Sequence, residues 1–457
     1  MRPKIGWILF TVSIGFALIQ LDVSIVNVAL PKMGADLHTG TAGLQWIVDA
    51  YALVFAALLL SAGAIGDRLG AHRAYSAGFI VFLASSLACG LAPSAGLLIG
   101  ARAVQGLGAA LMLPTSLAIL NHACQGDRAL RARAVGIWTA AGGAAVAAGP
   151  IVGGLLIQAI TWRSIFFVNL PLGALGWYLT ARVIPPTPVK PGHGLDPAGQ
   201  IFAILALAGW TGGVIEARPL GLGSPFVIGT LLLGLLSTVA FLRTESTTSN
   251  PMLPLKSFRL PNFSPAVLFG FIINLTYYGV VFVLSLYLQQ ALHYSPMQAG
   301  LAYLPLTATF VASNYLSGRM VSAFGSRLPM TIGALIAAAG FALLFPLGEH
   351  THFVSMLAPF LLLPSGMGLA VPAMTTAILA SVDRQDSGIA SGVLNAARQA
   401  GGAMGVAIFG ALAGGRIENI VPGLKWSALS SLVLLGGAFA LAAFGMRPEG
   451  GTASGRR

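Results

Sequence analysis

The chain is a succession of long apolar segments separated by short polar connections. Of its 457 residues, 56% are hydrophobic and only 8% are charged, whereas a soluble domain carries roughly 25% charged residues. A helix needs about 20 apolar residues to span the hydrocarbon of a bilayer. The segments that meet this length are 6–30, 44–64, 74–92, 97–120, 132–158, 163–183, 197–215, 224–243, 265–290, 298–320, 328–347, 353–378, 387–413 and 427–446. The sequence therefore predicts an all-α polytopic membrane protein with 14 transmembrane helices.

The placement of basic residues predicts the orientation in the membrane. Most of the 25 Lys and Arg residues lie in connections on the N-terminal side, such as Arg68 and Arg73, and few lie on the other side, such as Lys32 and Arg163. Cytoplasmic connections are enriched in Lys and Arg. Both termini are therefore expected in the cytoplasm, with the chain in the inner membrane of a bacterium. The same placement accounts for the net charge of +12 without a nucleic-acid partner.

A weak internal repeat divides the chain into two halves. Gly149 aligns with Gly405, and the run 63–73 has a degenerate echo in 318–327, at offsets of about 256 residues. Parallel halves related by an axis along the membrane normal are a transporter architecture with a central site. The alternative is chance similarity among Gly/Ala-rich helices. The predicted units are a six-helix bundle (1–188), two inserted helices (189–258), a second six-helix bundle (259–448) and a cytoplasmic tail (449–457).

Asp22 is the residue that most suggests a function. A carboxylate inside a bilayer costs several kcal/mol, on the order of 3 at the least, and is rarely kept without a task. It can carry a proton, bind a cation or pair with a buried arginine. Helix geometry places Asp22 about 24 Å and Asp49 about 22 Å above the inner ends of their helices, and Arg102 about 8 Å below an outer end. All three therefore lie in the outer part of a ~30 Å core.

Five motifs carry a resemblance to a known family. They are 21–31, 45–51, 63–73, 102–106 and 142–154. In this order they resemble the major facilitator superfamily, and more narrowly its fourteen-helix drug:proton antiporter branch, which includes multidrug and quaternary ammonium exporters. The resemblance covers essentially the whole chain. It implies the major facilitator fold and a secondary active transporter, not an enzyme.

The resemblance implies proton coupling by Asp22 together with Arg102. A neighbouring arginine favours the ionised carboxylate whereas burial favours the neutral acid, so substrate or conformation can switch the balance. The alternative is a static ion pair. Asp49 has two interpretations: it binds a cationic substrate, with Trp46 and Tyr51 adding cation–π contacts, or it is a structural acid wetted by the periplasm.

The second half has no acidic residue inside its six predicted helices. Coupling and cation recognition are therefore expected to depend on the first half, with monovalent cations favoured over dications. Candidates to line the second half of the cavity are Asn274, Tyr277, Tyr278 and Arg398. Arg398 is open to three roles: facing the cavity, pairing with backbone carbonyls, or meeting an anionic part of a substrate. Glu216 and Arg218 are expected in a solvated outer turn.

Two motifs have predicted conformational roles. The resemblance implies an intracellular latch that holds the outward-facing state, formed by Gly63, Asp67, Arg68, Gly70 and Arg73. The motif departs from the family pattern at Ala71, and its alternative role is to enforce topology by basic residues. Small residues allow close helix contact and proline kinks a helix. This predicts a hinge or sliding surface in the fifth helix, formed by Gly142, Gly149, Pro150, Gly153 and Gly154, with static packing as the alternative.

The sequence as a whole favours a proton-driven exporter of amphipathic, often cationic, compounds. It has no G-x-x-x-x-G-K-[ST] loop for ATP and no metal-ligand spacing, so no cofactor is expected beyond the proton motive force. A narrow exporter of one natural product is the alternative, and a membrane sensor or enzyme is a remote one. The expected partners are lipid, protons and lipophilic or cationic substrates. The protein is expected to be a monomer, and the sequence leaves open whether a periplasmic adaptor joins it.

Overall fold

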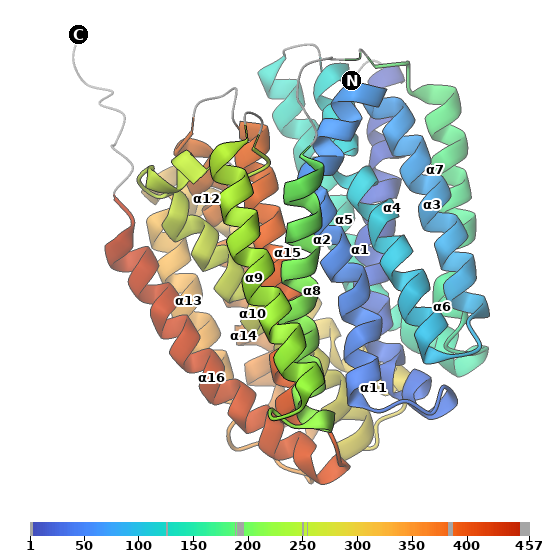
Figure 1. The fold of residues 1–457 in the computed structure, drawn as a ribbon, viewed down its shortest axis with the longest axis vertical. Coiled ribbons are helices and arrows are strands. Elements are labelled where there is room, and N and C mark those ends of the chain that lie inside the picture. The colour runs from blue at the N-terminus through green and yellow to red at the C-terminus, as the bar shows by residue number, and fades with distance from the viewer. Residues whose placement is uncertain are drawn as a thin grey trace.

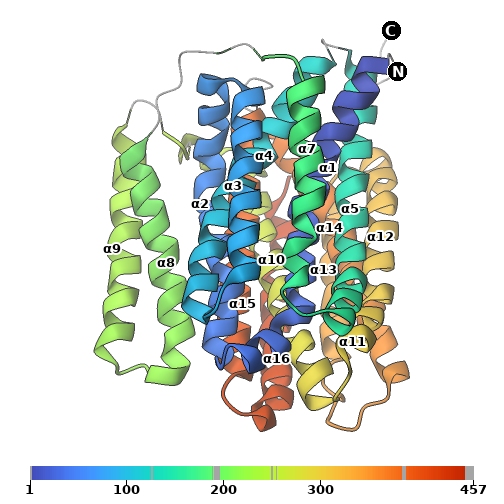
Figure 2. The same ribbon diagram turned by 90° about the vertical axis from the view of Figure 1, so that its right-hand side faces the viewer.

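The computed structural model is helical throughout the part of the chain that it describes, which contains no strand. The described residues are 3–124, 127–187, 189, 196–248, 251–253, 255–382 and 387–447. The long helices run roughly along one axis (Figures 1 and 2). We call the end that carries the N-terminus the upper end and the opposite end the lower end. A helix satisfies its own backbone hydrogen bonds, which a bilayer demands of any spanning segment.

The first bundle occupies the N-terminal part of the chain. Its elements are α1 (Pro3–Asp36), α2 (Thr41–Leu69), α3 (Ala71–Leu91), α4 (Ala95–Ala123), α5 (Arg128–Ala159), α6 (Ser164–Phe167) and α7 (Asn169–Val183). Side chains cap two of these helices at their first turns. The Ser94 hydroxyl accepts from the backbone N–H of Leu97, and Asp127 accepts from that of Leu130. Such caps satisfy N–H groups that have no partner within the helix.

Two inserted helices and a second bundle complete the molecule. The pair α8 (Pro197–Leu220) and α9 (Pro225–Thr247) stands outside the first bundle beside α2 (Figure 2). The second bundle contains η1 (Leu255–Arg259), α10 (Phe263–Leu286), η2 (Tyr287–Ala291), α11 (Pro296–Ala302), α12 (Leu304–Phe324), α13 (Arg327–Ala342), α14 (Phe353–Ala380), α15 (Ser387–Ala413), η4 (Ile417–Asn419), α16 (Ile420–Ala440) and η5 (Leu441–Gly445). The predicted boundary at 188 and the predicted tail, 449–457, lie outside the described residues.

Every predicted span coincides with a helix or with two consecutive helices. Within the described chain, 11 helices are long and apolar enough to cross a membrane. The predicted segments 298–320, 328–347 and 387–413 do not reach that standard. In segment 298–320, α12 is long enough with 21 residues, but it contains Arg319, Asn314 and several Ser and Thr residues. α13 has only 16 residues, and α15 is rich in Gly and polar residues. The all-helical architecture is therefore confirmed, while the number of 14 spans stays a prediction.

Proline explains two breaks that the sequence analysis missed. Segment 163–183 is divided between α6 and α7, and Pro171 has no N–H to donate to the carbonyl of Phe167 at the end of α6. Pro305 similarly lies in the first turn of α12, just after the break at Tyr303. In each case one predicted span is divided into a short helix and a longer one.

Proline at the end of the first segment has the opposite outcome. The predicted helix ends at residue 30, before Pro31, but α1 continues through Pro31 to Asp36. Pro31 cannot donate to the carbonyl of Asn27, four residues earlier. The Ser285 hydroxyl of α10 donates to that carbonyl instead. A side chain of the second bundle thus replaces the missing backbone bond and lets the helix continue.

The internal repeat corresponds to equivalent helix pairs. A Cβ added to Gly149 of α5 would lie 3.1 Å from the backbone nitrogen of Ile25 in α1. A Cβ added to Gly405 of α15 would lie 2.0 Å from the backbone oxygen of Leu275 in α10. Each glycine therefore allows its helix to approach the first helix of its own bundle. The pairs α1/α5 and α10/α15 are equivalent, as the offset of the repeat predicts.

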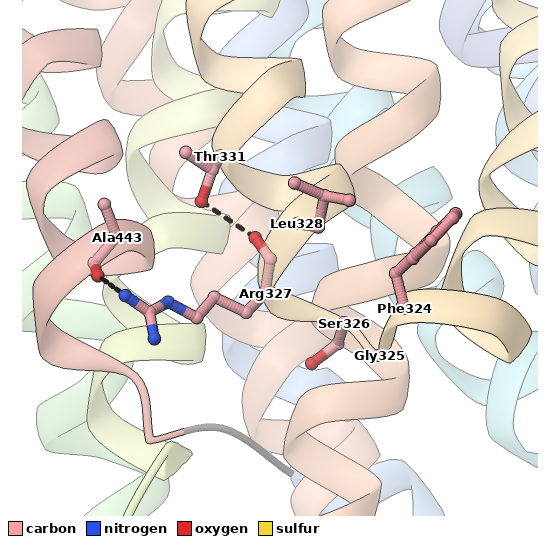
Figure 3. Close-up of a pocket in the computed structure, with 7 residues that line it drawn as sticks. All are labelled: Phe324, Gly325, Ser326, Arg327, Leu328, Thr331 and Ala443. Atoms are coloured by element: carbon pink, nitrogen blue, oxygen red, sulfur yellow. Dashed lines mark hydrogen bonds between the residues drawn. The ribbon is translucent and has the colours of Figure 1, made fainter. Parts of the chain in front are cut away.

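The echo of the 63–73 motif also has an equivalent place. Gly70 and Gly325 follow α2 and α12 with φ angles of +86° and +75°, in the region that favours glycine. The Thr187 hydroxyl, beyond α7, accepts from the backbone N–H of His72. In the second bundle Arg327 donates to the carbonyl of Ala443 in η5, beside a shallow pocket (Figure 3). Each turn is thus attached to the chain that follows the last helix of its bundle.

The two bundles are held together by hydrogen bonds near the lower end. Gln45 of α2 donates to the carbonyls of Val406 and Ala407 in α15, at 3.0 and 2.7 Å. Gln289 of η2 donates to the carbonyl of Val28 in α1, at 2.9 Å. These amides bond to carbonyls of buried helices, where an unpaired polar group would be costly. The structure therefore represents a conformation in which the lower ends are closed against each other.

We expect Gly70→Ala to destabilise the protein by about 1–3 kcal/mol, because alanine is strained at this positive φ. The added Cβ would also lie 3.1 Å from the carbonyl oxygen of Thr187. Gly63→Ala is the matched control within the same motif, because Gly63 is helical and a Cβ there meets nothing within 4 Å. Thermal unfolding of the detergent-purified variants measures the difference. Equal unfolding temperatures for the two variants would contradict the assigned role of Gly70.

Candidate functional site

Asp22 and Arg102 form a buried ion pair, as their predicted depths indicate. Arg102 Nη1 lies 2.5 Å from Asp22 Oδ2, and the two residues are 1% and 0% exposed. Asp22 belongs to α1 and Arg102 to α4, so the pair connects two helices of the first bundle. Solvent screens such a pair very little, and its electrostatic interaction is correspondingly strong.

Two amide side chains also donate to the Asp22 carboxylate. Gln105 Nε2 and Asn169 Nδ2 each lie 2.9 Å from Asp22 Oδ1. Both amides also donate to the Ser86 hydroxyl, at 2.8 and 3.3 Å. Asp22 thus accepts from one cationic and two neutral donors contributed by α4 and α7. Both oxygens of this buried carboxylate are therefore hydrogen-bonded, as buried polar groups generally are.

Arg102 is equally well surrounded. Its Nη1 also donates to Gln105 Oε1 at 2.6 Å, and its Nε donates to the carbonyl of Ile47 in α2 at 3.2 Å. The guanidinium carbon lies 4.3 Å from the ring centroid of Tyr51, which is a cation–π distance. The ring of Tyr51 was predicted to bind a cationic substrate, and in this structure its cation is Arg102. The Tyr51 hydroxyl is buried without a hydrogen-bond partner.

Local sequence explains how this cluster assembles. Arg102 and Gln105 are three residues apart, so they share one face of α4. Asn169 is the first residue of α7, directly after the break that Pro171 produces. The sequence analysis missed Gln105, Ser86 and Asn169 as site residues. Their signal is modest, since each is only a single polar residue within an apolar segment.

Asp49 lies in a different place from Asp22. It is 0% exposed, and neither of its carboxylate oxygens has a hydrogen-bond partner. Residues three and four apart share a helix face, and Gln45 and Trp46 on that face contact α15 and α8 respectively. Asp49 therefore lies over the seam where α2 meets α15 and α8. The interpretation of Asp49 as an acid wetted by solvent is wrong for this conformation.

Trp46 and Glu216 connect the first bundle to the inserted pair. Trp46 Nε1 donates to Glu216 Oε1 at 2.9 Å. Glu216 was expected in a solvated turn together with Arg218, but it is half-buried within α8. That expectation is wrong because α8 extends to Leu220, and only the exposed Arg218 lies at its end. Trp46 thus fills the interface with α8, and its predicted contact with a substrate remains a prediction.

The candidates in the second bundle divide into a structural residue and a polar aromatic group. Asn274 is 1% exposed and donates to the carbonyl of Gly270 within α10. Tyr277 and Tyr278 are half-buried, and their rings meet edge to face with centroids 5.6 Å apart. Tyr278 lies against α15, since a Cβ added to Gly402 would be 3.2 Å from its Cδ2, and Arg398 of α15 lies against α10 beside Gly270. Tyr278 and Arg398 thus both lie where α10 meets α15.

The small residues of α5 serve two contacts. Gly142, Gly149 and Gly153 face Phe16, Ser24 and Ile25 of α1, within the same bundle. Gly154 faces Pro296 and Met297 of α11, while the Pro150 carbonyl lies against Gly300. Most of the predicted sliding surface thus contacts its own bundle, and only its lower end contacts the other.

The 63–73 motif lies at the upper end of α2. Asp67 is half-buried, Arg68 and Arg73 are exposed, and Gly63 faces open space. The structure describes no ion pair for Asp67 in this conformation. The latch was predicted to hold the outward-facing state, and its role stays a prediction.

Comparisons with known proteins agree with this architecture. The family model described as Major Facilitator Superfamily matches residues 12–406. The chain is 34% identical to a methylenomycin A resistance protein of Bacillus subtilis, covering 95% of this chain and 92% of the relative. It is 35% identical to the multidrug resistance protein Stp of Mycobacterium tuberculosis, covering 88% and 75%. A solved peptide transporter has the same fold, with a TM-score of 0.70 at 16% identity over 95% of this chain and 94% of that one.

We expect Arg102→Leu to lower the free energy of unfolding by about 3–5 kcal/mol, because it leaves the Asp22 carboxylate buried without its counter-charge. Adding Asp22→Asn should recover most of that loss. The control is Arg163→Leu, which breaks the exposed pair with Asp36 and should cost less than about 1 kcal/mol. Unfolding in detergent is the measurement. Failure of the double variant to recover would contradict an energetically coupled pair.

Proposed function

The chain belongs to the Major Facilitator Superfamily, and from that premise we propose that it is a proton-coupled antiporter that exports amphipathic compounds. It is a multi-pass membrane transporter, not an enzyme, and its relatives include drug resistance proteins. The proposed transport cycle is alternating access between the two bundles. Transport would proceed as a monomer, driven by the proton motive force across a bacterial cytoplasmic membrane.

The Asp22 cluster is the observation that supports proton coupling. A buried carboxylate held by Arg102, Gln105 and Asn169 has a different set of favourable partners once it is protonated. Protonation would neutralise the carboxylate, weaken the pair and leave the arginine to find another partner. Because the donors come from α4 and α7 and the acid from α1, this change would alter contacts among three helices. A proton could thereby bias the bundle toward one conformation.

The proposed topology has 14 spans with both termini in the cytoplasm. The excess of Lys and Arg in the upper connections supports it. The lower end would then face outward, and the hydrogen bonds of Gln45 and Gln289 would close the outer side. The structure would accordingly represent an inward-facing state, in which the proposed latch at 63–73 is open.

The range of substrates has two candidate answers. A broad exporter of amphipathic cations requires an acid in contact with the substrate. For Asp49 to be that acid, α2 would have to separate from α8 and α15 so that the carboxylate becomes accessible. A dedicated exporter of one natural product is the second candidate. The relative named for resistance to a single compound, methylenomycin A, supports it. The coupling by Asp22 is the same in either case.

We expect Asp22→Asn to abolish proton-coupled efflux while expression remains normal, because an amide cannot take up and release a proton as a carboxyl group does. The variant also removes the counter-charge of Arg102, so transport is normalised to the amount of folded protein in the membrane. Accumulation of substrate inside inverted membrane vesicles, which corresponds to efflux from the cell, is measured under an imposed pH gradient with the lumen acidic. Asp36→Asn is the matched control, since Asp36 is an exposed acid at the lower end of the same helix. Undiminished efflux in the Asp22 variant would refute the proposed coupling.

A substrate panel distinguishes broad from dedicated export. We expect a pump-deficient bacterial host that expresses the protein to become resistant to several unrelated amphipathic compounds. Expression of the Asp22→Asn variant supplies the background. Resistance to one chemical series alone would select the dedicated exporter. Resistance restricted to cations would support a substrate contact by Asp49.

A further inference from the structure

Arg398 is a half-buried cation whose guanidinium has few hydrogen-bond partners among the described residues. Its Nε is buried and has no hydrogen-bond partner. The one hydrogen bond that the structure describes for its guanidinium is Nη1 to Asn395 Oδ1, at 3.4 Å, longer than the usual range for N–H···O bonds. An ionisable residue inside a membrane protein is rarely retained there without a function.

Arg102 provides an internal comparison. It contacts a carboxylate, an amide oxygen, a backbone carbonyl and an aromatic ring. The α-helices of the second bundle contain no Asp or Glu at all, so none of them can provide an acid for Arg398. The two arginines therefore differ in their counter-charge: Arg102 contacts a carboxylate, whereas no α-helix of the second bundle can offer one to Arg398.

The position of Arg398 is central. Its Cγ lies 3.5 Å from where a Cβ on Gly270 would stand, so the side chain lies along α10. Of the candidate spans, α10 with η2 is the most extensively buried, which argues against a lipid-facing site. Arg398 is half-buried overall, so the residue is not fully enclosed by its neighbours. Tyr278 of α10 lies against the same helix, α15, where a Cβ on Gly402 would be 3.2 Å from its Cδ2.

We propose that Arg398 is the charged subsite for substrates, and that it takes an amphipathic organic anion such as a carboxylate. The inference rests on the proposed export function and specifies its substrate class. A guanidinium can donate two parallel hydrogen bonds to a carboxylate, which would satisfy the Nε and Nη donors that now lack short partners. Tyr277 and Phe310, whose rings are stacked with centroids 6.4 Å apart, would contact the apolar body.

This assignment reverses the charge expected from the sequence. Asp49, the acid proposed for cations, is sealed at the seam of α2, α8 and α15 and is 0% exposed. Asp22 is already bonded to Arg102 and two amides. Arg398, which lies between α10 and α15, keeps donors without short partners, and a cation complements an anion.

The test uses three probes that share a phenylalkyl body and differ in the polar end group, which is anionic, neutral or cationic. They are tritiated 4-phenylbutyrate, 4-phenylbutanamide and trimethyl(4-phenylbutyl)ammonium. Scintillation-proximity binding is measured with the full-length protein in lipid nanodiscs. We expect Arg398→Gln to weaken carboxylate binding about ten- to hundredfold, as expected for losing a hydrogen-bonded charge. Binding of the amide and the ammonium compound should change less than about threefold.

Two further variants separate substrate recognition from structure. Arg398→Lys should give an intermediate affinity for the carboxylate, because it keeps the charge but loses the bidentate fork. Arg416→Gln, at an exposed arginine, is the surface control and should change nothing. A purely structural role for Arg398 predicts instead that Arg398→Gln weakens all three probes equally, and that result overturns the proposal.

The remaining outcomes are also decisive. Failure of the carboxylate to bind the unmodified protein overturns the proposal, whether or not the other probes bind. The transport assay in vesicles gives a separate result. If proton-coupled export is absent there, the proposed transport function is refuted, even if the carboxylate still binds. A charge-selective loss of binding in Arg398→Gln, with normal thermal unfolding, supports the anion subsite.

Discussion

The ion pair between Asp22 and Arg102 determines much of how the first bundle is built. An unpaired charge in so dry an environment would cost several kcal/mol, on the order of the stability of a whole domain. The pair therefore requires α1 and α4 to meet at one depth, and its amide donors bring α7 to the same place. One carboxylate thus connects three helices of the first bundle.

Close helix packing supports this electrostatic arrangement. Apolar side chains gain little by leaving lipid, so membrane helices associate through close contact and hydrogen bonds. Gly149 and Gly405 each allow a helix to approach the first helix of its own bundle. Gln45 and Gln289 then bond to carbonyls of the opposite bundle. Packing holds each bundle together, and a few polar bonds at the lower end connect the two bundles to each other.

The sequence predicted some site residues well and others poorly, for physical reasons. Helix rise alone placed Asp22 and Arg102 at the same depth, because depth along a straight helix is a count of residues. It could not assign the direction of a side chain. Trp46 and Tyr51 were both expected to face a substrate, yet one contacts α8 and the other lies against Arg102. Asn169 was missed because its position depends on a break in the helix.

The sequence by itself determined the membrane-spanning helices, the repeat of two bundles and the presence of charges that a bilayer does not tolerate without partners. These follow from hydrophobicity, helix rise and composition, which are local properties. Only the tertiary structure decided which charges are satisfied. Asp22 acquires three donors, whereas Asp49 and Arg398 keep unpartnered atoms. Whether a charged side chain has a partner depends on how each helix is rotated about its axis and on which distant segments contact it. Neither follows from the spacing of residues along one helix.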